Sequence, residues 1–198
     1  MYRAHTLRIL LLLAALSLAL AACGRTEIPE INAIDVSSES YPNDFLLTDH
    51  RGNPARLSDF RGKIVALFFG FTQCPDVCPT TLAAFSEVYA ALGRDADQVQ
   101  ILFITIDPER DTQQLLAEYI PAFDRRFIAL RGSAEETRRV ADGYKVSYVK
   151  IPSKEGNYYT LDHTAYVFLF DRTGRLRLKV PHGQPATALL KLIREIQD

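Results

Sequence analysis

The sequence predicts an α/β fold in which helices cover both faces of a mixed central sheet. Two stretches of chain carry this prediction, residues 63–71 (KIVALFFGF) and residues 99–106 (VQILFITI). Both are almost continuous apolar runs of strand length, as expected for strands buried on both faces. Each run is followed by apolar residues at helical spacing, in residues 80–92 and 112–120. This alternation of strand and helix is typical of an α/β sandwich.

The remaining elements follow in chain order. Residues 44–57 predict an N-terminal β-hairpin with its turn at 51–54. A brief strand over 127–130 precedes a helix that begins at Ser133, with Glu136 completing a capping box. The pattern then predicts strands at 146–151, 158–161, 165–171 and 176–180, and a last helix at 186–197.

The N-terminal residues indicate export. Residues 1–22 combine a basic start with a short apolar run and predict a signal peptide rather than a membrane span. The run ends in Leu20-Ala21-Ala22-Cys23, which resembles the lipobox of bacterial lipoproteins and predicts lipidation of Cys23. Residues 23–40 are then expected to be a membrane tether, and residues 41–198 the folded domain, facing the periplasm or the extracellular side.

Removal of the signal leaves 176 residues, enough for one domain with a substantial core. The loss of Arg3 and Arg8 changes the formal net charge from −1 to −3, and no basic patch indicates a nucleic-acid partner. With Cys23 set aside, Cys74 and Cys78 are the two cysteines that remain in an oxidising setting. They therefore form a single candidate pair.

The stretch Cys74-Pro75-Asp76-Val77-Cys78-Pro79 follows the first buried strand. It predicts a turn over residues 74–77 that brings the two sulfurs together, with Cys78 as the N-cap of the next helix. A helix N-terminus favours thiolate, which binds metals or attacks disulfides. The pair could thus be a reversible disulfide, a two-thiolate metal site or a static disulfide. Thioredoxin-type folds carry their chemistry at the same place, which is an argument by analogy.

Histidines supply the candidate third ligand. His163 follows Asp162 and stands directly before the predicted strand at 165–171, so its ring is able to point back across the fold. His50 and His182 lie in predicted turns and are expected to be solvated loop side chains.

Three motifs together resemble the Sco/SenC family of copper-handling proteins: the cysteine stretch at 74–79, Asp107-Pro-Glu-Arg-Asp-Thr at 107–112, and Asp162-His163-Thr164. The likeness covers about residues 40–198. It implies a monomeric thioredoxin-like domain that binds copper through Cys74, Cys78 and His163. It also implies a role in building the binuclear copper centre of cytochrome c oxidase.

The resemblance has limits that are informative. Gln73 stands where many relatives carry His, so an auxiliary imidazole ligand is not expected there, and Thr164 replaces the common Ser. Thioredoxins place two residues between their cysteines and a Trp before them, whereas this chain has three residues and no Trp. The positions that would carry the peroxiredoxin Thr and Pro are Phe71 and Leu67.

The implied ligands suit copper. Two thiolates select a soft ion such as Cu(I), and an imidazole allows Cu(II) at the same site, although zinc also accepts two Cys and one His. Asp76 and Asp162 are expected to orient the ligands from outside the coordination sphere. The segment 107–111 is expected to shape the site or a partner surface, with a solvent-exposed Arg110–Asp111 pair as the alternative.

Two functions remain open on the sequence. One is a copper chaperone that passes its ion to the copper-bearing oxidase subunit. The other is a thiol–disulfide oxidoreductase in which Cys74 and Cys78, as a redox-active pair, keep the oxidase cysteines reduced. Other copper chaperones or thiol–disulfide proteins of the periplasm are expected partners under either reading. A lipoprotein with a purely structural disulfide is a third, non-catalytic reading.

Overall fold

The computed structural model describes residues 32–154, 156 and 158–197. The predicted signal peptide (1–22), Cys23 and residues 24–31 of the predicted tether lie outside these residues. Within the described part of the chain, no helix has both the length and the apolar character needed to cross a bilayer.

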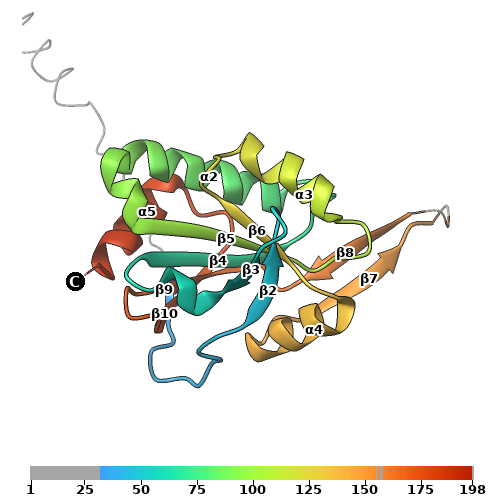
Figure 1. Cartoon of the computed structure of the whole chain (residues 1–198), viewed down its shortest axis with the longest axis horizontal. Coiled ribbons are helices and arrows are strands. Elements are labelled where there is room, and N and C mark those ends of the chain that lie inside the picture. Colours follow the sequence, from blue (N-terminus) through green and yellow to red (C-terminus); the bar gives the residue numbers. More distant parts are fainter. Residues whose placement is uncertain (1–31, 155, 157, 198) are drawn as a thin grey trace, which may run out of the picture.

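The centre of the molecule is an eight-stranded mixed sheet with the strand order β1-β10-β9-β4-β5-β6-β2-β3 (Figure 1). Its strands are β1 (Ile34–Asp35), β2 (Leu46–Asp49), β3 (Pro54–Arg56), β4 (Ile64–Gly70), β5 (Val99–Thr105), β6 (Ile128–Arg131), β9 (Tyr166–Phe170) and β10 (Leu176–Pro181). The three strands β4, β5 and β6 run parallel, and the other pairs are antiparallel. The predicted N-terminal hairpin is the β2–β3 pair.

Helices lie on both sides of this sheet. The helices are α2 (Val77–Leu92), α3 (Gln113–Tyr119), α4 (Ala134–Gly143) and α5 (Ala186–Glu195). In Figure 1, α2 and α5 lie along one side and α4 lies on the other. Ser133 and Glu136 form the capping box predicted for α4, since each side chain accepts from the other residue's backbone N–H. The predicted fold class, a mixed sheet with helices on both faces, is confirmed.

Strands β4 and β5 form the core because every residue in them is buried. Their side chains pack against helices on one face and against further apolar residues on the other, so neither strand needs a polar face. This is why both strands are recognisable in the sequence as unbroken apolar runs. The site is built where β4 ends.

Two features differ from the sequence predictions. Ile34 and Asp35 pair with β10, and Val36 is buried, so the sheet begins inside the stretch that was predicted to be tether. The strands β7 (Tyr148–Pro152) and β8 (Tyr159–His163) pair with each other in a separate two-stranded sheet. The segment that carries His163 is therefore an arm beside the main sheet.

The prediction that His50 is a solvated loop side chain is wrong. His50 is buried, its backbone N–H donates to the Ala129 carbonyl, and its Nδ1 accepts from the Ala129 N–H. The short hairpin turn places the ring against β6, so this imidazole satisfies a backbone donor. It is not part of the cluster of Cys74, Cys78 and His163, and its role is structural.

Candidate metal centre

The two cysteines lie at the junction of β4 and α2. The chain turns at the end of β4, where the Cys74 N–H donates to the Phe71 carbonyl at 3.2 Å. Helix α2 then begins at Val77, with Asp76 as its N-cap. The predicted turn at 74–77 and the predicted N-cap at Cys78 are therefore wrong. The hydrogen-bonded turn closes at Cys74, three residues earlier than expected, and Cys78 lies inside the first helical turn.

The cap of α2 explains how the sulfurs meet. The Asp76 side chain accepts no capping hydrogen bond, which leaves the first N–H groups of the helix to other partners. Cys74 provides one, because its Sγ accepts from the Cys78 N–H at 3.4 Å. The helix end thus draws the first sulfur toward the second. Both residues are free thiols, and Cys78 is 1 % exposed whereas Cys74 is 9 % exposed.

A glycine makes room for the inner sulfur. A Cβ placed on Gly70 would lie 2.6 Å from the Cys78 Sγ and 2.7 Å from the Phe103 ring, both closer than van der Waals contact allows. The last residue of β4 must therefore lack a side chain for Cys78 to pack there.

The arm formed by β7 and β8 brings in the imidazole. His163 is the last residue of β8, opposite Tyr148. Its Nδ1 lies 3.0 Å from the Thr164 carbonyl, and because a carbonyl only accepts, Nδ1 carries the hydrogen. This leaves Nε2 as the nitrogen with a free lone pair. The ring packs edge-on against Phe71, with 6.0 Å between ring centroids.

These three side chains come together as the sequence predicted. One ligand atom each from Cys74, Cys78 and His163 lies within 4.8 Å of the other two, a spacing that lets all three contact one ion. Phe71, Cys74 and His163 border an open cleft of about 320 Å³, so two of the three candidate ligands are reachable from outside, while Cys78 lies buried behind them. Two thiols and a lone-pair nitrogen are the donors that copper and zinc accept.

Other predicted residues border the same cleft. Asp76 and Asp162 both line it and both are exposed, and among the described residues neither carboxylate hydrogen-bonds a candidate ligand. His182 is exposed, as predicted for a solvated loop side chain, yet it also lines this cleft. Sequence reasoning had no signal for that placement, because the turn after β10 reaches the site only through the pairing of β10 with β9.

The two thiols differ sharply in acidity. A hydrogen bond from Cys78 lowers the pKa of Cys74 to about 4, and the backbone N–H groups of Cys78 and Asp76 act in the same direction. The same hydrogen bond, together with burial, raises the pKa of Cys78. At neutral pH the pair therefore holds one proton, which belongs to Cys78, and Cys74, which borders the cleft, is the thiolate. A pair in this state is ready both to bind a soft cation and to attack a disulfide.

The segment 107–111 lies against the site, and the alternative prediction of a solvent-exposed Arg110–Asp111 pair is wrong. Arg110 pairs with Asp107 rather than with Asp111, and Asp111 is fully buried. Gln73 accepts from Arg110 Nη1 at 3.2 Å and is therefore tied to this segment. The sequence singled out these residues as a motif but gave no indication of their partners.

The fold and the site together define an α/β domain with a dithiol–imidazole cluster at the start of its first long helix. The chain belongs to the SCO1/SenC family, whose model matches residues 35–198.

Several relatives support this membership. The chain is 43% identical over 133 residues to the mitochondrial SCO2 homologue of Bos taurus, a match that covers 66% of this chain and 50% of that protein. It is 36% identical to an SCO2-like protein of Rickettsia felis, over 67% of this chain and 65% of that protein. The matches thus span between half and two thirds of the curated relatives' lengths.

Solved structures agree. ScoI of Bradyrhizobium japonicum with copper bound is similar at a TM-score of 0.72 and 38% identity, covering 79% of this chain and 99% of that one. Yeast Sco1 with copper bound gives a TM-score of 0.71 at 30% identity, over 79% and 87% of the two chains. The expected thioredoxin-like sandwich of this family is the fold observed.

Proposed function

We propose that this protein is a copper-binding metallochaperone that assists assembly of the binuclear copper centre of cytochrome c oxidase. The observation that carries the proposal is the convergence of Cys74, Cys78 and His163 ligand atoms within 4.8 Å of one another. Copper as the cargo is supported by the two similar structures that contain it. The oxidase as the destination follows from the family likeness.

The donor set suits a protein that must hold copper in both oxidation states. Two sulfurs satisfy Cu(I), and the Nε2 lone pair of His163 supplies the harder donor that Cu(II) favours. The Thr164 carbonyl accepts from Nδ1 and so fixes the orientation of the ring from outside the coordination sphere. Asp76 and Asp162, at the rim of the cleft, would add negative charge close to the ion. Release to a client then proceeds by ligand exchange at Cys74, which borders the open cleft.

The cellular setting belongs to the same proposal. Cys23 is the proposed lipid attachment site, and a short tether would hold the domain near a membrane on the periplasmic or extracellular side. The copper-bearing oxidase subunit is the proposed client, with other copper chaperones or thiol–disulfide proteins of that compartment as further partners. The domain is proposed to act as a monomer.

A second function is favoured by a specific observation, the unequal acidity of the two thiols. The Cys74 thiolate would attack a disulfide in the client and form a mixed disulfide with it. Cys78, after losing its proton, would then attack the Cys74 sulfur and release the client's sulfur as a thiolate. In that exchange Cys74 and Cys78 lose two electrons and become a disulfide, while the client disulfide becomes two thiols. Such chemistry needs no imidazole, which separates it from copper delivery.

The first experiment is an anaerobic titration of the domain with Cu(I) and Cu(II), with Zn(II) as competitor. It is followed by the thiolate-to-Cu(II) charge-transfer absorption. His163→Ala should abolish tight Cu(II) binding, and His182→Ala, which removes another imidazole from the same cleft, is the matched comparison and should retain it. Absence of a charge-transfer band in the wild type would refute the copper assignment.

A cellular arm separates the two functions. The His163→Ala chain is expressed in cells that lack the native protein, and oxidase activity is measured. If the protein delivers copper, cells with the His163→Ala chain should lose oxidase activity. Full oxidase assembly with this variant would replace the chaperone by the reductase, and normal respiration with Cys74→Ser and Cys78→Ser would leave only a structural role for the pair.

A further inference from the structure

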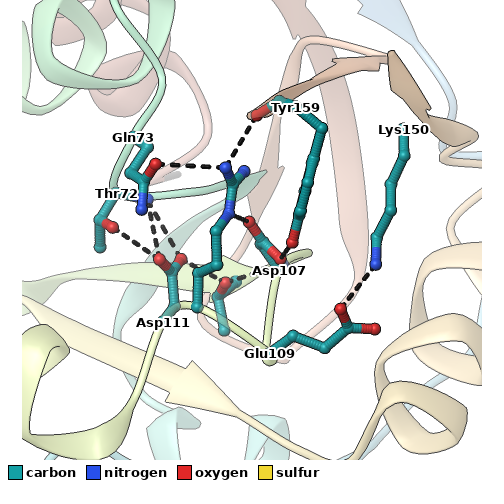
Figure 2. A network of polar contacts seen from close by, with 9 residues as sticks. Thr72, Gln73, Asp107, Glu109, Asp111, Lys150 and Tyr159 are labelled. Atoms are coloured by element: carbon teal, nitrogen blue, oxygen red, sulfur yellow. Dashed lines mark hydrogen bonds and ion pairs between the residues drawn. The ribbon is translucent and has the colours of Figure 1, made fainter. Parts of the chain in front are cut away.

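The segment between β5 and α3 contacts both halves of the ligand set. Asp107 and Asp111 lie between the cysteine turn on one side and the β7–β8 arm on the other, as Figure 2 shows. Arg110 donates to a residue on each side, Gln73 and Tyr159. The sequence predicts only that this segment shapes the site or a partner surface. Its contacts on the two sides indicate a more specific role.

On the cysteine side, the buried Asp111 holds the residue two positions before Cys74. Its carboxylate accepts from the Thr72 N–H at 3.1 Å and from the Thr72 hydroxyl at 2.6 Å, and Thr105 Oγ1 donates to it at 2.5 Å. Arg110 Nη1 adds a hydrogen bond to Gln73 at 3.2 Å. The turn that presents Cys74 is thus fixed to the end of β5.

On the arm side, Arg110 and Asp107 hold Tyr159, the first residue of β8. The Arg110 guanidinium stacks on the Tyr159 ring at 3.6 Å from its centroid, and Nη1 donates to the Tyr159 carbonyl at 2.7 Å. The Tyr159 hydroxyl donates to Asp107 Oδ1 at 2.8 Å, and Arg110 Nε pairs with the other oxygen of that carboxylate. Arg110 therefore contacts the ring and the carbonyl of Tyr159, and also Asp107, the residue that accepts from the Tyr159 hydroxyl.

Side-chain contacts rather than the main sheet hold the arm: besides the contacts of Arg110, Lys150 pairs with Glu109, Arg138 lies over the Tyr148 ring, and Leu161 is buried. In the described part of the chain, β7 and β8 pair with each other and with no strand of the main sheet. A two-stranded sheet by itself is marginally stable. His163 lies at the far end of β8 from Tyr159, so an arm that swings away from Arg110 takes the imidazole away from the sulfurs.

We infer that Arg110 is a positioning residue that sets the distance between the His163 imidazole and the Cys74–Cys78 pair. It thereby controls binding of Cu(II), which uses all three ligands, more than binding of Cu(I), for which two thiolates suffice. This inference rests on the proposed function for its metal, but the clamp itself is a property of the metal-free protein.

The test compares Arg110→Leu with Arg126→Leu. Arg126 makes the same two kinds of contact away from the site, an ion pair with Asp124 and a cation–π contact with Tyr89 at 4.4 Å. The affinities for Cu(I) and Cu(II) and the charge-transfer spectrum are measured for both variants. In Arg110→Leu we expect Cu(II) affinity to fall about tenfold or more, the usual effect of losing an outer-shell partner, and the band to shift. Cu(I) affinity should change much less, and Arg126→Leu should leave both unchanged.

A second measurement needs no metal. Amide hydrogen exchange across residues 159–163 should accelerate in metal-free Arg110→Leu and stay at the wild-type rate in Arg126→Leu. Arg110→Lys should restore exchange protection and Cu(II) affinity only in part, since an ammonium lacks the planar fork that stacks and binds in two directions.

Equal losses of Cu(I) and Cu(II) affinity, or unchanged exchange in the arm, would overturn the inference. A wild-type protein that binds neither ion would refute the proposed function instead, while the exchange comparison would still decide on the clamp.

Discussion

Phe71 joins the two halves of the candidate site: its carbonyl accepts from the Cys74 N–H, and its ring packs edge-on against His163 at 80° between the ring planes. One buried residue thus restrains both the turn of the first cysteine and the orientation of the imidazole.

Phe71→Leu should lower the Cu(II) affinity severalfold and lower the free energy of unfolding only modestly. An edge-on aromatic pair contributes about 0.5–1.5 kcal/mol beyond burial, so we expect a modest loss of stability and a severalfold loss of Cu(II) affinity. Phe127→Leu is the control, because Phe127 is equally buried and packs edge-on against Tyr89 instead. Urea unfolding and Cu(II) competition measure both effects. A Cu(II) affinity that drops equally in the two variants would show that stability alone is responsible.

Cys74 should react with iodoacetamide far faster than Cys78 at neutral pH. The pKa of Cys74 is lowered to about 4, chiefly by the hydrogen bond from Cys78, and thiolate is the reactive form. Its alkylation rate should therefore stay near its maximum at pH 6 and fall as the pH approaches about 4. Mass spectrometry of timed, quenched samples identifies the labelled residue. Faster labelling of Cys78, or a rate that begins to fall above pH 8, would contradict the assigned proton.

Gly70→Ala should damage the thiol pair directly. The new methyl group would lie 2.6 Å from the Cys78 sulfur, so that side chain must move, at a cost of about 1–3 kcal/mol. We expect lower Cu(I) affinity together with lower stability. Gly143→Ala is the control, because its methyl group would lie 2.7 Å from Pro42 and far from the cysteines. Normal Cu(I) binding by the Gly70 variant would mean that Cys78 tolerates displacement.

His50 should make the fold sensitive to mild acid. Burial, with a smaller effect from Arg51, lowers the pKa of His50, and the proton would occupy the nitrogen that accepts from Ala129. The unfolded chain therefore binds more protons than the native one as the pH falls below the ordinary histidine value of about 6.5, and stability falls with it. His50→Gln should flatten this dependence. Urea unfolding between pH 7.5 and about pH 5 measures it, and parallel curves for the two proteins would exclude His50 as the cause.

Sequence reasoning recovered the fold where one physical signal dominated. Strands β4 and β5 are buried on both faces and could be read from apolar runs alone, and the capping box at Ser133 fixed the start of α4. The start of α2 was placed wrongly because Pro79 fits several positions in a first helical turn. The partners of His50 and Arg110 could not be foreseen, since they arise from contacts between elements distant in sequence.

The ligands of the candidate site could be predicted from the sequence, but the contacts that hold them in place could not. Cys74, Cys78 and His163 were identified from residue type and family likeness, and they do converge. His163 was expected in the link between the predicted strands at 158–161 and 165–171, whereas it is the last residue of β8. The separation of β7 and β8 as a two-stranded sheet depends on which strand edges are hydrogen-bonded, and the local sequence of β8 does not encode that choice.

The ligands come from regions of the chain separated by residues 79–162. A chain that is still extended offers two neighbouring sulfurs and no nitrogen donor beside them. Only molecules in which β8 has already packed beside the cysteine turn can bind the ion through all three ligands. Three-ligand binding of copper is therefore restricted to the folded protein.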